Sequence, residues 1–350
     1  MSYNKPRPRP QPSQIIAPKP YHLIPLPKEK PQLQPPKGQD QYYRDREACS
    51  EGTYRVHGTL HLKLTVQTGL HVSTGVVALG TDVGQKSIPL IKTMIQGSEG
   101  QLIIPGSSLK GVVRSTYEAI TRSCLCKTKA KPNQIPPGYQ ECRDKTQLCP
   151  ACRVFGALNW QGLIQFRDAE CESTEFRPGF MPSLYRPRPH EYPGYFNQEK
   201  VAGRKFYYHT IRAIDKGQQQ GISVQQAVKT FGFTTSLPYR NLTQAELGTL
   251  LIVLGQDTQH AIALKVGGGK PIGMGTMTVE VTSIEPVDNI RDRYLSYQSQ
   301  SQPLTGKPLQ QFIQQAIQAA HRELVQSQPL QELVKVLGYP TKREPPEGMY

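Results

Sequence analysis

A strict alternation of apolar and polar residues from Tyr54 to Val66 constrains the fold of this chain more than any other feature. Apolar side chains or glycine occupy every second position, and only a strand with one buried face explains that period. The folded part of the chain therefore begins with a strand. Hydrophobic residues make up 37% of the 350, enough to bury a core behind it, so a wholly disordered chain is disfavoured.

Two helices are predicted from apolar spacing and capping residues. Apolar residues three and four apart predict a helix over residues 108–122, with Ser107 or Ser108 available as its N-cap. The segment Thr243-Gln-Ala-Glu246 is a capping box, in which side chains at both ends bond the free amides of the first turn. It opens a second core helix through the apolar segment that follows.

Further strands are predicted from alternation and from β-branched composition. They cover residues 162–169, 228–237, 261–266 and 276–284. The order strand, helix, strand, strand, helix, strand is that of a ferredoxin-like (RRM-like) βαββαβ domain, an α+β fold that RNA-recognition domains use.

Composition divides the rest of the chain. Eleven of the 31 prolines lie in the first 36 residues, so we expect residues 1–48 to form a disordered or extended basic arm. That arm is either a solvated tail or a segment that drapes over RNA or a neighbouring subunit. Within the domain expected at 49–290, residues 69–104 predict a long loop or irregular hairpin, and residues 171–225 an inserted arm with a hairpin. An amphipathic helix makes residues 291–350 a helical extension.

The charge balance indicates the partner. Lys and Arg number 42 against 27 Asp and Glu, a formal net charge of +15 that favours polyanions, with nucleic acid first. No run of 18 apolar residues occurs, and the first ten residues, MSYNKPRPRP, lack the apolar stretch of a signal peptide. We therefore expect a cytoplasmic protein with no membrane partner.

Five of the seven cysteines fall between Cys124 and Cys152, in a loop expected at residues 123–153. Because a reducing compartment disfavours disulfides, the cluster predicts a structural zinc ion that staples the loop, with four thiolates closing its coordination. The alternative is unliganded or redox-active thiols. The expected ligands are Cys142, Cys149 and Cys152, with Cys126 or Cys124 as the fourth.

Two segments could hold phosphates. The glycine-rich segment lets backbone amides approach an anion, and its candidates are Gly267, Gly268, Gly269, Lys270, Gly273 and Gly275. It is not a Walker loop, because Pro271 follows the lysine, and the alternative is a tight connection between strands. The helix at 108–122 offers Ser107, Ser108, Lys110 and Arg114 at or near its start, and the alternative there is a solvated basic face.

Four segments carry a family resemblance: IPGSSLKGVVRSTYEAI, CPACRVFG, NLTQAELGTLL and GGGKPIGMGTMTVEV, in that order. Over about residues 53–285 the chain resembles the RAMP superfamily of CRISPR-associated proteins, most of all the repeated backbone subunit of type III effector complexes. The resemblance implies a palm that binds guide RNA in a filament of similar RAMP subunits. It also implies an inserted thumb that interrupts pairing of guide and target RNA, for which residues 171–225 are the counterpart.

The resemblance further implies an endoribonuclease. In such subunits a loop aspartate after the first strand cuts the target RNA with Mg²⁺ or another divalent cation, the adjacent ribose 2′-hydroxyl attacking the phosphate. Asp82, the only acidic residue between Glu51 and Glu99, corresponds best to that aspartate. The link from Asp82 to Pro89 is longer than the family's usual one, so a catalytically inactive structural subunit is the alternative.

A second alternative is a guide-processing endoribonuclease, which needs a positioned histidine. His57 and His71 are its candidates. His57 alternates with the core residues of the first strand, so we expect both histidines to be structural.

Overall fold

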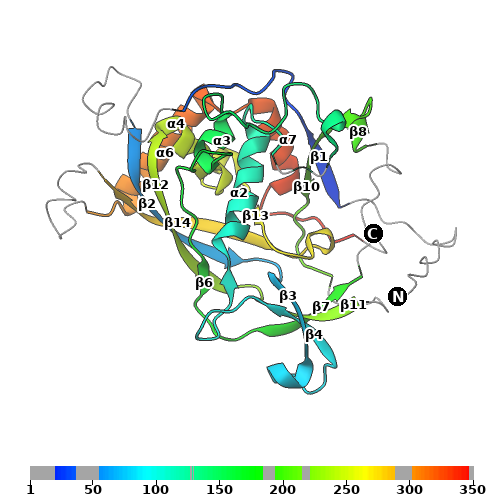
Figure 1. The fold of residues 1–350 in the computed structure, drawn as a ribbon. Coiled ribbons are helices and arrows are strands. Elements are labelled where there is room, and N and C mark those ends of the chain that lie inside the picture. The colour runs from blue at the N-terminus through cyan, green and yellow to red at the C-terminus, as the bar shows by residue number, and fades with distance from the viewer. Residues whose placement is uncertain are drawn as a thin grey trace.

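The structure is a computed structural model that describes residues 20–36, 55–126, 128, 130–183, 194–214, 221–287 and 302–346. It is a mixed α+β chain built on one six-stranded sheet, with the strand order β13-β14-β2-β12-β6-β5 and every neighbouring pair antiparallel (Figure 1). The strands of this sheet are β2 (Arg55–Val66), β5 (Ile103–Ile104), β6 (Ala169–Cys171), β12 (Gly232–Thr243), β13 (Leu264–Lys265) and β14 (Thr276–Pro286).

The predicted first strand is confirmed in β2, whose residues are alternately half-buried and buried along its whole length. The helices gather on the side of the sheet that receives its apolar face (Figure 1). They are α2 (Gly106–Ile120), α3 (Pro150–Phe155), α4 (Gln244–Val253), α6 (Gly306–Glu323) and α7 (Ser327–Leu337). In the described part of the chain no helix combines the length and the apolarity needed to cross a membrane.

Both core helices are confirmed, but only one has the predicted cap. In α4 the Thr243 hydroxyl accepts from the amide of Glu246 and the Glu246 carboxylate accepts from the amide of Thr243, each at 3.0 Å. Helix α2 begins earlier than predicted, after Pro105, so Ser107 and Ser108 lie inside its first turn and do not cap it. The Asp168 carboxylate, distant in sequence, accepts instead from the first amide of α2.

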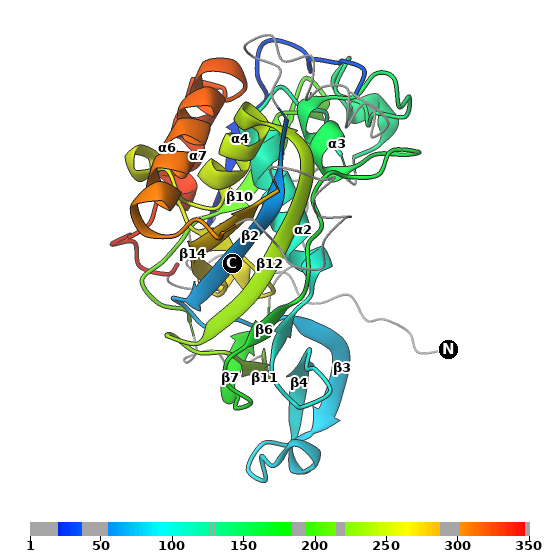
Figure 2. The same cartoon turned by 90° about the vertical axis from the view of Figure 1, so that its left-hand side faces the viewer.

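A long loop and an irregular hairpin are the two alternatives predicted for residues 69–104, and the structure contains the irregular hairpin. Strand β3 (Ser73–Leu79) pairs with β4 (Leu90–Met94), and the 3₁₀ turn η2 (Gly80–Val83) lies between them. With β11 (Gly221–Gln226) and β7 (Arg177–Pro182) they make a second sheet in the order β3-β4-β11-β7. This sheet projects from the end of the main sheet (Figure 2).

The described part of residues 171–225 contains more than one hairpin. Besides β7 and β11 it holds the small hairpin of β8 (Phe196–Asn197) and β9 (Lys200–Val201), followed by β10 (Gly203–Tyr207). Residues 184–193 and 215–220 of the predicted insertion lie outside the described residues.

The described part of the N-terminal arm includes an extended strand that pairs with the rest of the chain. Strand β1 (Tyr21–Pro25) pairs antiparallel with β10, and the Tyr139 hydroxyl donates to the carbonyl of Pro27 at 2.6 Å. Residues 20–36 are therefore not a free tail, because they pair with and pack on their own chain. The rest of the predicted arm, residues 1–19 and 37–48, lies outside the described residues.

The strand predicted over residues 162–169 is wrong for most of its length. Regular pairing covers only β6, and before it a single bridge joins Ile164 to Tyr239. Leu163 and Ile164 are both buried, whereas a strand with one buried face buries only every second residue.

The extension at 291–350 contains the predicted helix, α6, and a second helix, α7, that the apolar spacing did not predict. Short 3₁₀ turns are η3 (Pro132–Gln134), η4 (Thr258–His260) and η5 (Lys270–Ile272).

Candidate functional site

A groove of about 450 Å³ lies where the start of α2, strand β10 and the turn after β13 meet. It brings together the two segments that the sequence proposed separately as phosphate sites. Its polar or flexible lining includes Ser107, Ser108, Gly111, Lys205, Lys265, Gly267, Gly268 and Lys270. One side of α2, from Ser107 in its first turn to Thr116, lines the groove.

Lys265 gives the groove its unusual electrostatics. It is 5% exposed and donates to the carbonyl of Gly273 at 3.1 Å and the hydroxyl of Thr276 at 3.3 Å, so its described partners carry no charge. Burial first, and the neighbouring charge of Lys270 second, lower the pKa of Lys265 to about 7. Burial also lowers the pKa of Lys270. Among the described residues that line the groove none is acidic, so the lining offers no carboxylate to balance a charged Lys265, and an anion bound in the groove would favour its charged form.

Lys205 adds a third cation and an aromatic surface. Its Nζ lies 4.0 Å from the ring centroid of Tyr21 and 4.7 Å from that of Tyr207, and it donates to the Tyr195 hydroxyl at 2.9 Å. Tyr207 itself lines the groove. Cations beside aromatic rings are the arrangement with which single-stranded RNA is held, phosphates on the cations and bases on the rings.

The glycine-rich turn divides into lining and structural residues. Gly269, Gly273 and Gly275 do not line the groove. The alternative prediction, a tight connection between two strands, fits these three glycines. At Gly275 φ is 87°, and a Cβ would collide with the carbonyl oxygen of Val266. That collision explains the glycine without any ligand.

Two basic residues of α2 lie elsewhere than expected. Lys110 is half-buried and not among the groove's lining, and burial and the charge of Arg114 lower its pKa. The Arg114 guanidinium points inward, donating to the Glu118 carboxylate at 2.8 Å and to the sulfur of Cys152 at 3.3 Å. These contacts do not support Arg114 as a phosphate ligand, because a fixed internal pairing already uses its charge.

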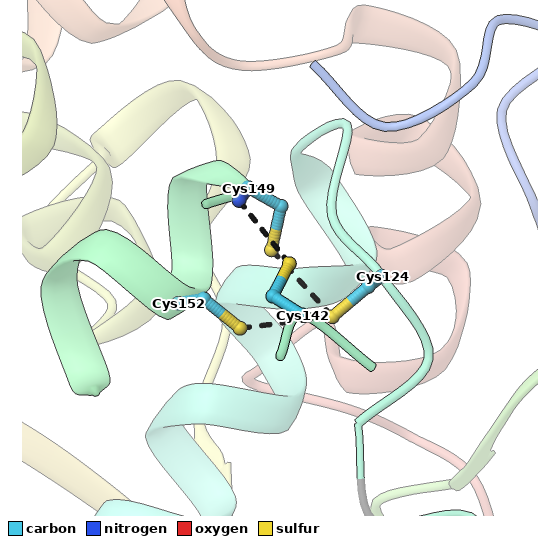
Figure 3. Close-up of side chains that lie close together, drawn as sticks. All are labelled: Cys124, Cys142, Cys149 and Cys152. Carbon is cyan, nitrogen blue, oxygen red and sulfur yellow. Dashed lines mark hydrogen bonds between the residues drawn. The ribbon is translucent and has the colours of Figure 1, made fainter. Parts of the chain in front are cut away.

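Four cysteines converge where the sequence predicted a metal site (Figure 3). The sulfur of Cys124 lies 3.7 Å from that of Cys152 and 3.6 Å from that of Cys149, and all four sulfurs, with Cys142, lie within 4.8 Å of one another. A tetrahedral Zn²⁺ with Zn–S bonds of about 2.3 Å holds its sulfurs about 3.8 Å apart. The buried cluster therefore fits a structural zinc ion with all four positions taken by protein.

The cluster settles which cysteine is the fourth member. Cys124 belongs to it, and Cys126 does not, because its sulfur donates to the Glu141 carboxylate at 3.3 Å. Burial raises the pKa of the Cys126 thiol to about 12, so that thiol stays protonated. Arg114, on Cys152, and Arg204, which donates to the carbonyl of Cys124 at 2.9 Å, surround the cluster. Donors that contact the ligand residues in this way hold metal ligands in place.

Asp82 lies apart from both sites. It is exposed in η2, at the end of the β3–β4 hairpin, and its carboxylate accepts from the Thr81 hydroxyl at 3.4 Å. Among the described residues it belongs to no group of three carboxylate, imidazole or thiol side chains that could hold a metal. Strand β3 separates the turn that holds Asp82 from Ser73, which lines the groove.

The two histidines considered for guide processing have internal partners. His71 is 1% exposed, and its Nδ1 lies 2.7 Å from the carbonyl of Gln225. Burial lowers the pKa of His71, which keeps its ring neutral. The Nδ1 of His57 accepts from the amide of Asn241 at 2.8 Å. Neither ring is presented in the groove.

Lys265 and Lys205 are groove residues that sequence reasoning missed. Lys265 carried a signal, because it is the one charged residue in the apolar run Ala-Ile-Ala-Leu-Lys-Val at 261–266. A charge inside a buried strand needs a partner or a function. Lys205 carried none, since it lies among other basic and aromatic residues of the insertion.

Comparison with known proteins bears on the family. The family model of the RAMP superfamily matches residues 63–278, which include the cysteine cluster, the second sheet and most of the residues that line the groove. A search of curated proteins finds no match. Because the match covers more than half of the chain, this protein belongs to the RAMP superfamily of CRISPR-associated, RNA-binding proteins.

Proposed function

We propose that this chain is a guide-RNA-binding backbone subunit of a type III CRISPR effector complex and that it cuts target RNA paired with the guide. The observation that supports RNA binding is the groove, where three lysines, the serine-rich side of α2 and a glycine turn meet without an acidic lining residue in the described chain. Such a surface selects a phosphate chain. The family match supports RNA as that chain.

The strand order supports a ferredoxin-like palm. If β2, β6, β12 and β14 are counted as the four strands of a βαββαβ unit, their order in the sheet is 4-1-3-2. Helix α2 follows the first strand and α4 follows the third, as that topology requires. The second strand, β6, is reduced to three residues, and β5 extends the sheet beyond it.

Zinc in this subunit would be structural. Cys124, Cys142, Cys149 and Cys152 would hold it and leave no coordination position for a substrate. Its physical effect would be to fix the segment after α2 against α3, because the four ligands come from both sides of that segment. Since Arg204 of β10 reaches the same cluster, the cluster also anchors the insertion that carries Lys205 into the groove.

Asp82 would act at a distance from the guide. The β3–β4 hairpin carries Asp82 away from the groove, and in this proposal the target strand paired with the guide meets its carboxylate there. There Asp82 would orient the ribose 2′-hydroxyl or hold a divalent cation near the phosphate. The 2′-oxygen forms a bond to phosphorus as the bond to the 5′-oxygen breaks, and the proton lost by the 2′-hydroxyl is balanced by one gained at the leaving oxygen.

Lys270→Gln tests the groove in the full chain with a single-stranded guide RNA. We expect affinity to fall about tenfold and the slope of log affinity against log salt to shrink by ~0.7, the share of one phosphate on a single strand. Lys307→Gln is the matched control, since Lys307 is exposed at the start of α6 and does not line the groove. Equal losses in the two variants would show that only net charge matters and would remove the groove from the proposal.

Asp82→Ala tests cleavage in the assembled complex with Mg²⁺ and a guide-complementary RNA. We expect the defined cut to disappear while target binding is unchanged. Glu99→Ala is the control, an exposed acidic residue in the turn after β4. Unchanged cutting in Asp82→Ala would assign this chain the second role, a structural RNA-binding subunit without nuclease activity. Cleavage of free repeat RNA by the isolated protein would instead indicate the guide-processing reading.

A further inference from the structure

Three side chains outside the groove and the cysteine cluster converge on one point. The Asp257 Oδ2 lies 2.9 Å from the Nδ1 of His260 and 2.8 Å from the Nε2 of His321, and the three ligand atoms lie within 4.8 Å of one another. Asp257 is the N-cap of η4 and His260 its last residue, after the core helix α4, whereas His321 lies in the last turn of α6. The site therefore joins the C-terminal extension to the domain.

We propose that Asp257, His260 and His321 bind one divalent transition cation, of the class of Zn²⁺, Co²⁺ or Ni²⁺. Two imidazoles and one carboxylate are the donor set that such borderline cations take, with open positions left for water. Calcium and magnesium are disfavoured, because they prefer sites built from oxygen ligands.

The geometry needs only a small adjustment to admit the ion. Ligands at about 2.1 Å from a tetrahedral metal lie about 3.4 Å apart, so the two nitrogens have to retreat from the carboxylate by about 0.5 Å. The Asp257 side chain is 5% exposed, but those of His260 and His321 are 26% and 31% exposed, which gives both a route of entry and room to move. The two rings already lie side by side, with centroids 5.3 Å apart.

The proton balance is also simple. Each imidazole now directs a nitrogen at the carboxylate, and a neutral imidazole can carry its single proton on its other nitrogen instead. The ion then replaces two hydrogen bonds on Asp257 by two metal–nitrogen bonds and one metal–oxygen bond. The carboxylate remains anchored by its other oxygen, which accepts from the amide of Gln259 at 3.0 Å.

The test counts metal ions bound to the full chain, with Co²⁺ as the probe and the cysteine cluster already loaded with Zn²⁺. We expect wild type to bind one Co²⁺ without the thiolate charge-transfer absorption of a cysteine site. His321→Gln should bind Co²⁺ at least about tenfold more weakly, although glutamine can still donate to Asp257 and keep α6 in place. Hydrogen exchange of α6 should slow with Co²⁺ in wild type and not in this variant.

His22→Gln is the matched control, because His22 is a half-exposed histidine whose Nε2 lies 3.8 Å from one carboxylate, that of Glu332, with no second imidazole in its ion pair. It should bind Co²⁺ like wild type. No Co²⁺ bound by wild type, or equal binding by wild type and His321→Gln, would overturn the proposal and leave the three residues as a hydrogen-bonded clamp. Neither outcome touches the RNA groove, which shares no residue with this site.

Discussion

Replacing Lys265 by methionine should make the free protein more stable and bind RNA more weakly. The pKa of Lys265 falls from 10.5 to about 7, and one pKa unit corresponds to about 1.4 kcal/mol. Keeping this lysine in the fold therefore costs about 4 kcal/mol at pH 7 relative to a neutral side chain. Methionine has a similar length and no charge to bury.

Part of that gain is lost with the hydrogen bonds of the ammonium group. Lys265 donates to two acceptors, but Gly273 also accepts from the Thr68 hydroxyl at 2.8 Å and Thr276 keeps its contact with His209 at 3.0 Å. Neither acceptor is orphaned, so each lost bond costs about 1 kcal/mol. We expect a net stabilisation of about 2 kcal/mol for Lys265→Met at pH 7.

The stability gained by Lys265→Met should depend on pH in a way that identifies its cause. Between pH 7 and 10.5 the unfolded wild type binds more protons at this lysine than the folded one, so wild-type stability rises with pH across that window. The gain from Lys265→Met should be largest at or below pH 7 and should shrink toward pH 10. Urea unfolding at several pH values, followed by circular dichroism, measures it, with the exposed Lys307→Met as the control.

RNA binding supplies the second readout. A phosphate in the groove favours the charged form of Lys265, so wild type should take up a proton when it binds RNA just above pH 7, and Lys265→Met should not. Calorimetry in buffers of different ionisation enthalpy detects that proton. A variant that is less stable than wild type at pH 7, or one that binds RNA with unchanged affinity and unchanged proton uptake, would refute the account of Lys265 as a buried charge kept for an anion.

The remaining predictions concern the cluster, the turn and a helix cap. Cys124→Ser should contain one zinc ion fewer than Cys126→Ser in elemental analysis of the purified chain; equal zinc in both variants would contradict the assignment. Gly275→Ala should lower the free energy of unfolding by at least about 2 kcal/mol, since alanine is strained at positive φ and its Cβ meets a backbone oxygen, and a change below the error of urea unfolding would contradict this. Thr243→Ala should cost about 1 kcal/mol in the same assay by removing the cap of α4, and a neutral effect would show that the capping box contributes nothing.

Features that depend on neighbours in the chain could be read from the sequence. The alternation around Leu60 predicts β2, and the spacing of Leu109 and Val113 predicts α2, because a buried face imposes the period of the backbone on the apolar residues. The capping box at Thr243 and the turn at Gly275 are equally local. The strand predicted over residues 162–169 is wrong for most of its length because Leu163 and Ile164 are successive and both buried. A strand with one buried face buries only every second residue.

The sequence alone therefore predicts the separate features: a first strand, two core helices, a cysteine cluster and two basic segments. Which of these side chains lie in contact follows from the tertiary structure. It placed Cys124 and not Cys126 in the cluster, turned Arg114 inward to Glu118, and brought Lys265 into the groove. The physical reason is that local pattern follows from the periodicity of one backbone segment, whereas convergence depends on how distant segments pack, which no single segment encodes.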